Sequence, residues 1–254
     1  KGKFMDLIAQ TAGVRKEDIL GTDLFLYCRS QGVIWGLNGE YLSSPKLDDL
    51  QCTFANLQGF LSGGHPNTIS VYAVFDNEEV GSRTMQGAGG DFLENVLRRI
   101  AYALKFDDNE YYKALAASFL ISLDNAHAMH PNHPEKCDPT NRTLPGGGVV
   151  IKAHADKAYT TDAMSSAVVK ALFDRAGVKY QTFFNRSDMP SGGTLGAISS
   201  GHVGVLSADL GLAQLAMHSA CECFAKADYD ELIGGLTAYY SSDILFTEEG
   251  IKLK

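Results

Sequence analysis

A regular alternation of short apolar segments and amphipathic helices constrains this chain most, and it runs from Pro45 onward. The apolar segments are short and hydrophobic nearly throughout, and they cover residues 68–75 (TISVYAVF), 119–124, 147–154, 180–186 and 202–209. The predicted helices cover residues 47–61, 91–104, 109–118, 160–177 and 228–241. In the second of these, Phe92, Val96 and Ile100 recur at helical spacing. Apolar strands separated by helices predict a three-layer α/β fold, in which helices cover both faces of a sheet.

The first 44 residues have a different pattern. They predict a short helix over residues 4–11, an extended segment over 23–28 and a strand near 33–37. We interpret residues 1–44 as the tail of a small β-rich module and residues 45–254 as the main domain. Because the chain begins with Lys1 and a helix already under way, we expect it to be a piece of a longer protein.

Composition excludes several classes of partner. A formal charge of -8 and a pI near 5.3 argue against nucleic acid or an anionic membrane, since phosphate binding needs a positive surface. The five cysteines include no CxxC pair, which favours a reducing, cytoplasmic setting. No apolar stretch approaches the roughly 20 residues that span a bilayer, so we expect no membrane contact.

Carboxylates and histidines follow several of the predicted strands, where ligands bind in α/β sheets. They fall within residues 76–79, 124–130, 188–194 and 209–218. A single buried Asp or His usually has a structural role, so the set carries more weight than any member.

The motif DNEEVGS suggests one metal ligand and one general base, because Glu78 and Glu79 are adjacent at a predicted strand-to-loop corner. The alternative is a solvated first turn of the next helix.

In LDNAHAMHPNHP, Asp124 and three histidines are spaced by three, but Pro131 and Pro134 break any helix there. We therefore expect Asp124 to be the ligand and His127 to lie near the substrate. The remaining histidines of this segment, His130 and His133, are expected to be loop residues, as are His65, His154 and His202.

Two further segments have plain structural alternatives. Asp48 and Asp49 precede an apolar helix, and N-capping alone would explain them, with Asp49 as cap or exposed residue. His218 lies beside an apolar run, where histidines are usually packed in the core.

Five segments together resemble the aspartyl aminopeptidase family of co-catalytic zinc peptidases. They are KLDDL, FDNEEVGS, LDNAHAMHPN, RSDMPSGGTLG and QLAMHS. The resemblance extends from Pro45 to the end, and residues 19–50 resemble the path out of the family's inserted dimerisation domain. It implies a zinc-peptidase sheet preceded by the C-terminal part of that domain, and self-association into dimers and larger closed assemblies.

The resemblance also implies roles for individual residues. Asp48 would bridge two divalent metal ions, with Glu79 and His218 completing one site and Asp124 binding the other. Glu78 would be the general base. The ions would be zinc foremost, with manganese or cobalt also compatible.

The resemblance implies a substrate-binding set as well. The predicted members are His127, Lys152, Asp188, Gly192, Gly193 and Thr194, with Lys152 facing an acidic side chain. The family's second metal also takes a His from an upstream segment, which nothing in this chain matches. Either that segment lies outside this chain, or the second metal is weakly held.

These features predict a metalloaminopeptidase that removes an N-terminal Asp or Glu from a peptide. Two alternatives remain, namely a catalytically impaired assembly or interaction protein and an aminopeptidase for neutral N-termini. Nucleotide binding through LPGGGVV is excluded, because Gly146 to Gly148 precede a strand and no P-loop lysine follows.

Overall fold

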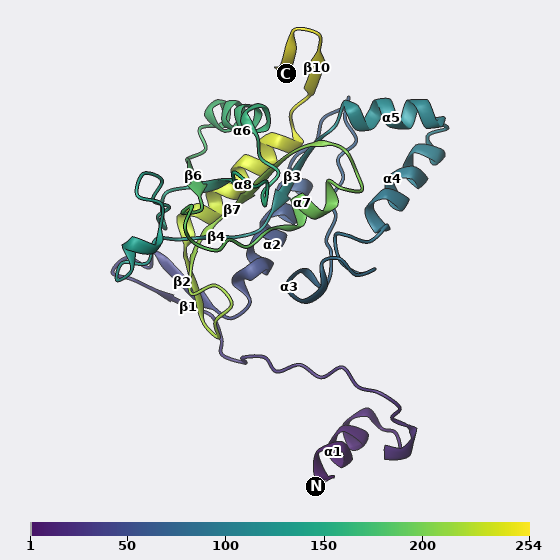
Figure 1. Ribbon diagram of the computed structural model, residues 1–254, viewed down its shortest axis with the longest axis vertical. Helices are drawn as coiled ribbons and strands as arrows, with labels where there is room; N and C mark the ends of the chain where they lie inside the picture. Colours follow the sequence, from purple (N-terminus) through teal and green to yellow (C-terminus); the bar gives the residue numbers. More distant parts are fainter. Residues whose placement is uncertain (1) are drawn as a thin grey trace.

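The computed structural model describes residues 2–254 and contains a body of sheets and helices with an N-terminal extension (Figure 1). Helix α1 (Lys3–Ala12) and the short 3-10 helix η1 (Lys16–Asp18) lie apart from the body, to which an extended segment joins them. Helix α1 was predicted. The segment 23–28 is extended as expected but forms no strand with the described residues.

The body contains seven α-helices among the described residues. They are α2 (Leu47–Ser62), α3 (Glu78–Gly81), α4 (Phe92–Ala103), α5 (Asp108–Ala116), α6 (Ala163–Ala176), α7 (Leu195–Ser199) and α8 (Lys226–Tyr240), with a 3-10 turn η2 (Pro134–Lys136). The five predicted helices are confirmed as α2, α4, α5, α6 and α8. Helix α6 ends at Gly177, whose φ of 68° suits a residue without a Cβ.

The central sheet has four strands in the order β3-β7-β5-β6. Their bounds are β3 (Phe119–Leu123), β5 (Val149–Ala153), β6 (Tyr180–Phe184) and β7 (Leu206–Gly211). Strands β3 and β7 are parallel, β5 and β6 are parallel, and β5 runs antiparallel to β7. The carboxyl ends of β5 and β6 therefore lie at the opposite edge from those of β3 and β7.

A second sheet has the order β1-β2-β9-β8-β4, and a hairpin ends the chain. The strands are β1 (Val33–Trp35), β2 (Tyr41–Ser44), β4 (Ala126–His127), β8 (Ala213–Leu215), β9 (Glu222–Ala225), β10 (Ile244–Thr247) and β11 (Gly250–Leu253). Strand β2 pairs with β9, so the ladder crosses the domain boundary predicted after residue 44. The division into domains stays a prediction.

The two faces of the central sheet differ in chemistry. One face contributes Val149, Ile151 and Leu210 to a core shared with α6 and α8. Because side chains alternate along a strand, Lys152 and Asp209 lie on the other face, and both are buried. Helix α7 covers that face, with Gly196 against Asp209. Helices on both faces confirm the predicted three-layer α/β class.

Residues 68–75 correct one prediction. They are extended, but no described strand pairs with them, and Ile69, Val71 and Val74 are exposed. Apolar and β-branched residues favour an extended backbone, but only a neighbouring strand converts it into a sheet strand. No helix in the described residues 2–254 has the length and apolar character needed to cross a membrane.

Candidate metal centre and active site

Asp48 sits in the first turn of α2, where the backbone is not helical (φ -86°, ψ 114°), and its peptide bond to Asp49 is cis. The side chain is 2% exposed. No side chain caps this helix, whose N-cap is Lys46. N-capping by Asp48 or Asp49 is therefore wrong as an explanation of this acidic pair.

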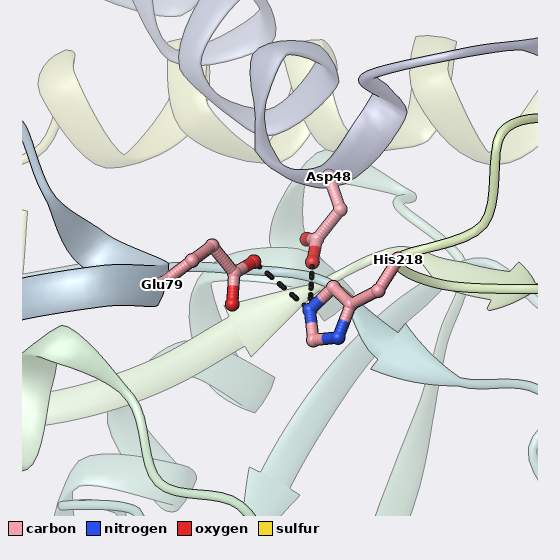
Figure 2. A group of neighbouring side chains, drawn as sticks. All are labelled: Asp48, Glu79 and His218. Carbon is pink, nitrogen blue, oxygen red and sulfur yellow. Dashed lines mark ion pairs between the residues drawn. The ribbon is translucent and has the colours of Figure 1, made fainter. Parts of the chain in front are cut away.

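Glu79 of the short helix α3 and His218 of the loop after β8 meet Asp48 (Figure 2). His218 Nε2 lies 3.1 Å from Asp48 Oδ2 and 2.9 Å from Glu79 Oε1. His218 follows β8 with a φ of 64°, and its side chain is 60% exposed, so the core-packing alternative is wrong. Burial opposes protonation, but the two carboxylates outweigh it, and the pKa of His218 is raised.

Asp124 follows β3 and contributes to a second cluster with Asp48 and Asp49. Asp48 belongs to both clusters, in each of which the candidate ligand atoms lie within 4.8 Å of one another. This sharing is the arrangement expected of a bridging carboxylate. Sequence reasoning missed Asp49, because nothing in the motif distinguishes a cap from a buried acid. Burial raises the pKa of Asp49 well above its usual range, and the charge of Asp124 adds to this effect.

Glu78 begins α3, next to Glu79 and half-buried. Burial raises the pKa of Glu78 to about 7, assisted by the charges of Asp124, Glu79 and Asp48. The alternative of a merely solvated helix turn does not fit a carboxyl group in such surroundings. A carboxyl group that titrates near neutral pH is suited to accept and return a proton.

Lys152 lies in β5 at 1% exposure, and all its polar contacts are to residues after β3. Its ammonium donates to the carbonyl oxygen of Asp124 at 2.7 Å, to Asp124 Oδ2 at 3.2 Å and to the carbonyl oxygen of Asn125 at 3.1 Å. In this structure Lys152 therefore holds the Asp124 segment and is not exposed to a substrate. Its predicted contact with an acidic side chain stays a prediction.

A cavity of about 930 Å³ opens beside Glu78 and Glu79. It is lined by residues of α3, α7 and the loops between, including Arg83, Lys157, Gly193, Thr194 and His202. Gly193 and Thr194 belong to the predicted substrate-binding set, and that role stays a prediction. His202 was expected only as a loop residue. Arg83 and Lys157 were missed, because they belong to no motif and only folding brings them to this cavity.

The remaining predicted substrate residues are more scattered. Thr194 is buried and donates from Oγ1 to Asp209 Oδ1 at 2.7 Å, which anchors its loop to β7. Asp188 is exposed and pairs with Arg186 at 2.6 Å in the segment after β6, whose carboxyl end lies at the opposite edge of the sheet from that of β3. Gly192 is exposed nearby. For Asp188 and Gly192 a role in substrate binding stays a prediction.

His127 ends β4, where it is exposed and pairs with Gln214 of β8, the strand that precedes His218. His130 and His133 face each other, with ring centroids 5.4 Å apart, and His133 pairs with Glu135. Both lie in an exposed loop, as the sequence predicted.

The donor chemistry fits zinc. One imidazole nitrogen and carboxylate oxygens are ligands that zinc accepts, and Asp48 Oδ2, Glu79 Oε1 and His218 Nε2 already converge without an intervening basic side chain. The second cluster offers oxygen donors alone, from Asp48, Asp49 and Asp124.

Comparisons with known proteins agree with this site. Residues 1–240 match the family model for aminopeptidase I zinc metalloprotease (M18). The chain is 46% identical over 226 residues to a probable M18 family aminopeptidase 2 of Clostridium novyi, covering 89% of this chain and 52% of that protein. The chain thus spans about half the length of the curated relatives it matches.

Two solved structures show the same relationship. An M18 aminopeptidase of Thermotoga maritima superposes with a TM-score of 0.85 at 25% identity, covering 94% of this chain and 54% of that one. The mApe1 dodecamer of S. cerevisiae superposes with a TM-score of 0.77 at 29% identity, over 94% and 54% of the two chains. The family model over residues 1–240 and these relatives show that this chain belongs to the M18 family of zinc metalloproteases.

Proposed function

We propose that this chain carries the catalytic centre of a zinc aminopeptidase that releases an N-terminal Asp or Glu from peptides. The observation that carries the proposal is the position of Asp48, which is shared by two clusters of candidate ligands beside Glu78 and an open cavity.

Each residue of the centre has a separate task. Asp48, Glu79 and His218 would hold one ion, and Asp48 and Asp124 would contribute to a second. When bound, zinc supplies a water that ionises near neutral pH and an electrophile for the peptide carbonyl. Glu78 would accept the proton of the attacking water and return it to the leaving amine. Lys152 holds Asp124 in place through its contacts with that residue.

The cavity supports a preference for acidic residues. Arg83, Lys157 and His202 bring positive or protonatable groups to its walls, next to the acidic centre. A carboxylate of the substrate's first residue would be attracted to these groups, whereas a leucine side chain would not. This attraction is our reason for preferring an acidic over a neutral N-terminus.

We further propose that the protein self-associates in the cytoplasm. Its relative of known structure from S. cerevisiae is a dodecamer. The cysteines Cys28, Cys52, Cys137, Cys221 and Cys223 are all free thiols, which suits a reducing compartment.

The test is the release of the first residue from two peptides by the zinc-loaded protein, one beginning with Asp and one with Leu. Cleavage restricted to the Asp peptide supports the proposal. Cleavage of the Leu peptide at an equal rate would favour the alternative of a neutral aminopeptidase. No cleavage of either by a folded, zinc-loaded protein would favour a non-catalytic assembly protein.

The variant E78Q tests the proposed role of Glu78 as general base, since it removes the proton acceptor and keeps the size of the side chain. We expect a loss of turnover of about 10²–10⁴-fold, the usual contribution of general acid–base catalysis. Zinc content, measured by elemental analysis, should equal that of the wild type. Retained turnover would show that another group accepts the proton.

A further inference from the structure

Glu222 is a buried carboxylate that contacts the backbone of two metal-binding segments. It begins β9 and is 2% exposed. Its Oε2 accepts a hydrogen bond from the backbone N–H of Asp48 at 3.0 Å, and its Oε1 accepts one from the backbone N–H of His218 at 2.8 Å. One planar group thus joins segments that are far apart in the sequence.

Both segments depend on such hydrogen bonds, because the backbone is irregular at each of the two candidate ligands. Asp48 has non-helical dihedral angles inside the first turn of α2, and His218 has a φ of 64° in the loop after β8. An irregular backbone is not held by a repeating ladder of hydrogen bonds. The position of each ligand is therefore set by its individual contacts, among which the carboxylate of Glu222 is common to both.

Glu222 itself is fixed by the sheet. Its backbone lies in β9 opposite Ser44 of β2, the strand that leads directly into the Asp48 segment. Its side-chain oxygens are not among the ligand atoms of either metal cluster. The residue therefore acts on the centre through the backbone of its neighbours.

We propose that Glu222 is a positioning residue, which holds Asp48 and His218 at the separation that zinc binding requires. This inference rests on the proposed function. Charge-assisted hydrogen bonds from two backbone N–H groups to one carboxylate fix both donors relative to a single rigid group. Residues that orient metal ligands in this way typically change metal affinity by 10–100-fold when replaced.

Asp228 offers a matched control within the same part of the chain. It is 1% exposed, and its two oxygens accept hydrogen bonds from the backbone N–H groups of Gly146 and Gly148, at 2.7 and 2.8 Å. It belongs to neither metal cluster. Replacing either acid by its amide removes one of two similar acceptors, so D228N reproduces the structural damage of E222Q away from the centre.

The experiment measures the zinc dissociation constant of the wild type, E222Q and D228N by competition with a chromophoric chelator. The thermal unfolding of each metal-free protein is recorded alongside. We expect E222Q to weaken zinc binding by about 10–100-fold and D228N to leave it unchanged, while both lower the melting temperature. The visible spectrum of the Co²⁺-loaded protein should shift in E222Q alone, because it reports the geometry of the ligands.

Two outcomes would overturn the inference. One is an E222Q protein with wild-type zinc affinity and an unchanged cobalt spectrum. The other is a D228N protein that loses as much zinc affinity as E222Q. If E222Q does not fold, E222D tests the inference instead, since it keeps the charge but shortens the side chain. Unaltered zinc binding by E222D would equally contradict a positioning role. Failure of the wild type to bind zinc would overturn the proposed function as well. This outcome is distinct from the two above, in which the wild type binds zinc.

Discussion

At the scale of single residues, the sequence predicted which acids and which histidine meet, and the structure adds how they are supported. Asp48, Glu79, His218 and Asp124 are brought together as expected. Motifs contain ligands because ligand chemistry demands particular side chains. The supporting groups Asn125 and Glu222 escaped prediction, because a buried side chain that hydrogen-bonds neighbouring segments has no sequence signature until the fold brings those segments to it.

Asn125 illustrates this support. Its side-chain nitrogen donates to the carbonyl oxygen of Leu47 at 3.2 Å and to Asp48 Oδ1 at 3.0 Å, and its oxygen accepts from Gln51. It immediately follows the predicted ligand Asp124. From the sequence it is simply an amide in a loop.

Because Asp48 is shared by both clusters, we expect substitutions of Asp48 and His218 to lower the zinc content of the protein to different extents. D48N weakens a donor common to both clusters, whereas H218A removes a ligand of one cluster only. We expect D48N to lower the zinc content at both sites and H218A to lower it at one. Elemental analysis after dialysis against a fixed free zinc concentration measures this. Equal zinc content in the two variants would contradict a bridging role for Asp48.

At the scale of elements, periodicity predicted the longer helices well. The helices α4 and α6 follow the 3.6-residue period and lie where expected. The short strands β8 and β9 were not predicted, because three or four residues contain too little alternation to distinguish a strand from a loop. Residues 68–75 were predicted as a strand for the opposite reason, since a long apolar segment was present but a pairing strand was not.

The contact between α2 and α8 depends on the absence of a side chain at Gly59. A Cβ there would lie 2.5 Å from the Cβ of Leu236, which is fully buried. We expect G59A to lower the free energy of unfolding by about 1–3 kcal/mol, because the two helices must separate. Denaturant unfolding measures it. The control is G64A, whose Cβ would meet nothing within 4 Å, and an equal loss in both variants would contradict the argument.

The N-terminus of α6 gives a prediction with a defined pH dependence. Asp162 caps the helix by accepting from the backbone N–H of Ser165 at 2.7 Å, and this hydrogen bond lowers the pKa of Asp162. D162A should lower the free energy of unfolding by about 1 kcal/mol at pH 7. Because the pKa of Asp162 is lowered by folding, its charge makes its full contribution to the free energy of unfolding at pH values above the pKa of the unfolded state, near 3.9.

The difference between wild type and D162A should therefore shrink as the pH falls below about 4, through the pKa of the folded state. Denaturant titrations at pH 7 and at pH values below 4 provide the comparison. A difference that stays constant over this range would show that the cap does not depend on the charge of Asp162.

At the scale of the whole molecule, an apolar stretch ahead of the body remains exposed. It comprises the large hydrophobic residues Leu24, Phe25, Leu26, Tyr27, Val33, Ile34, Trp35 and Leu37. Exposed apolar side chains in such number often mark an interaction site. It lies in the part that the sequence assigned to a dimerisation module, and it is consistent with the proposed self-association.

We expect L26E to weaken self-association by at least about tenfold, since burying a leucine contributes about 1.5–3 kcal/mol and each 1.4 kcal/mol is a factor of ten. Sedimentation velocity over a range of concentrations measures the change. The control is L61E, which alters an equally apolar, exposed residue near the C-terminal end of α2. An unchanged assembly in L26E would place the interface elsewhere.

The hydrogen bonds of Glu222 join segments that are far apart in the sequence, and this separation has a consequence for folding during translation. Asp48 and Glu222 are 174 residues apart, and the ligand His218 is synthesised only shortly before Glu222. During translation the earlier carboxylates emerge from the ribosome long before the loop that completes their site. In a nascent chain the proposed zinc site would thus stay unfinished until the loop of His218 has been made, and metal capture would follow the synthesis of residues 48–222.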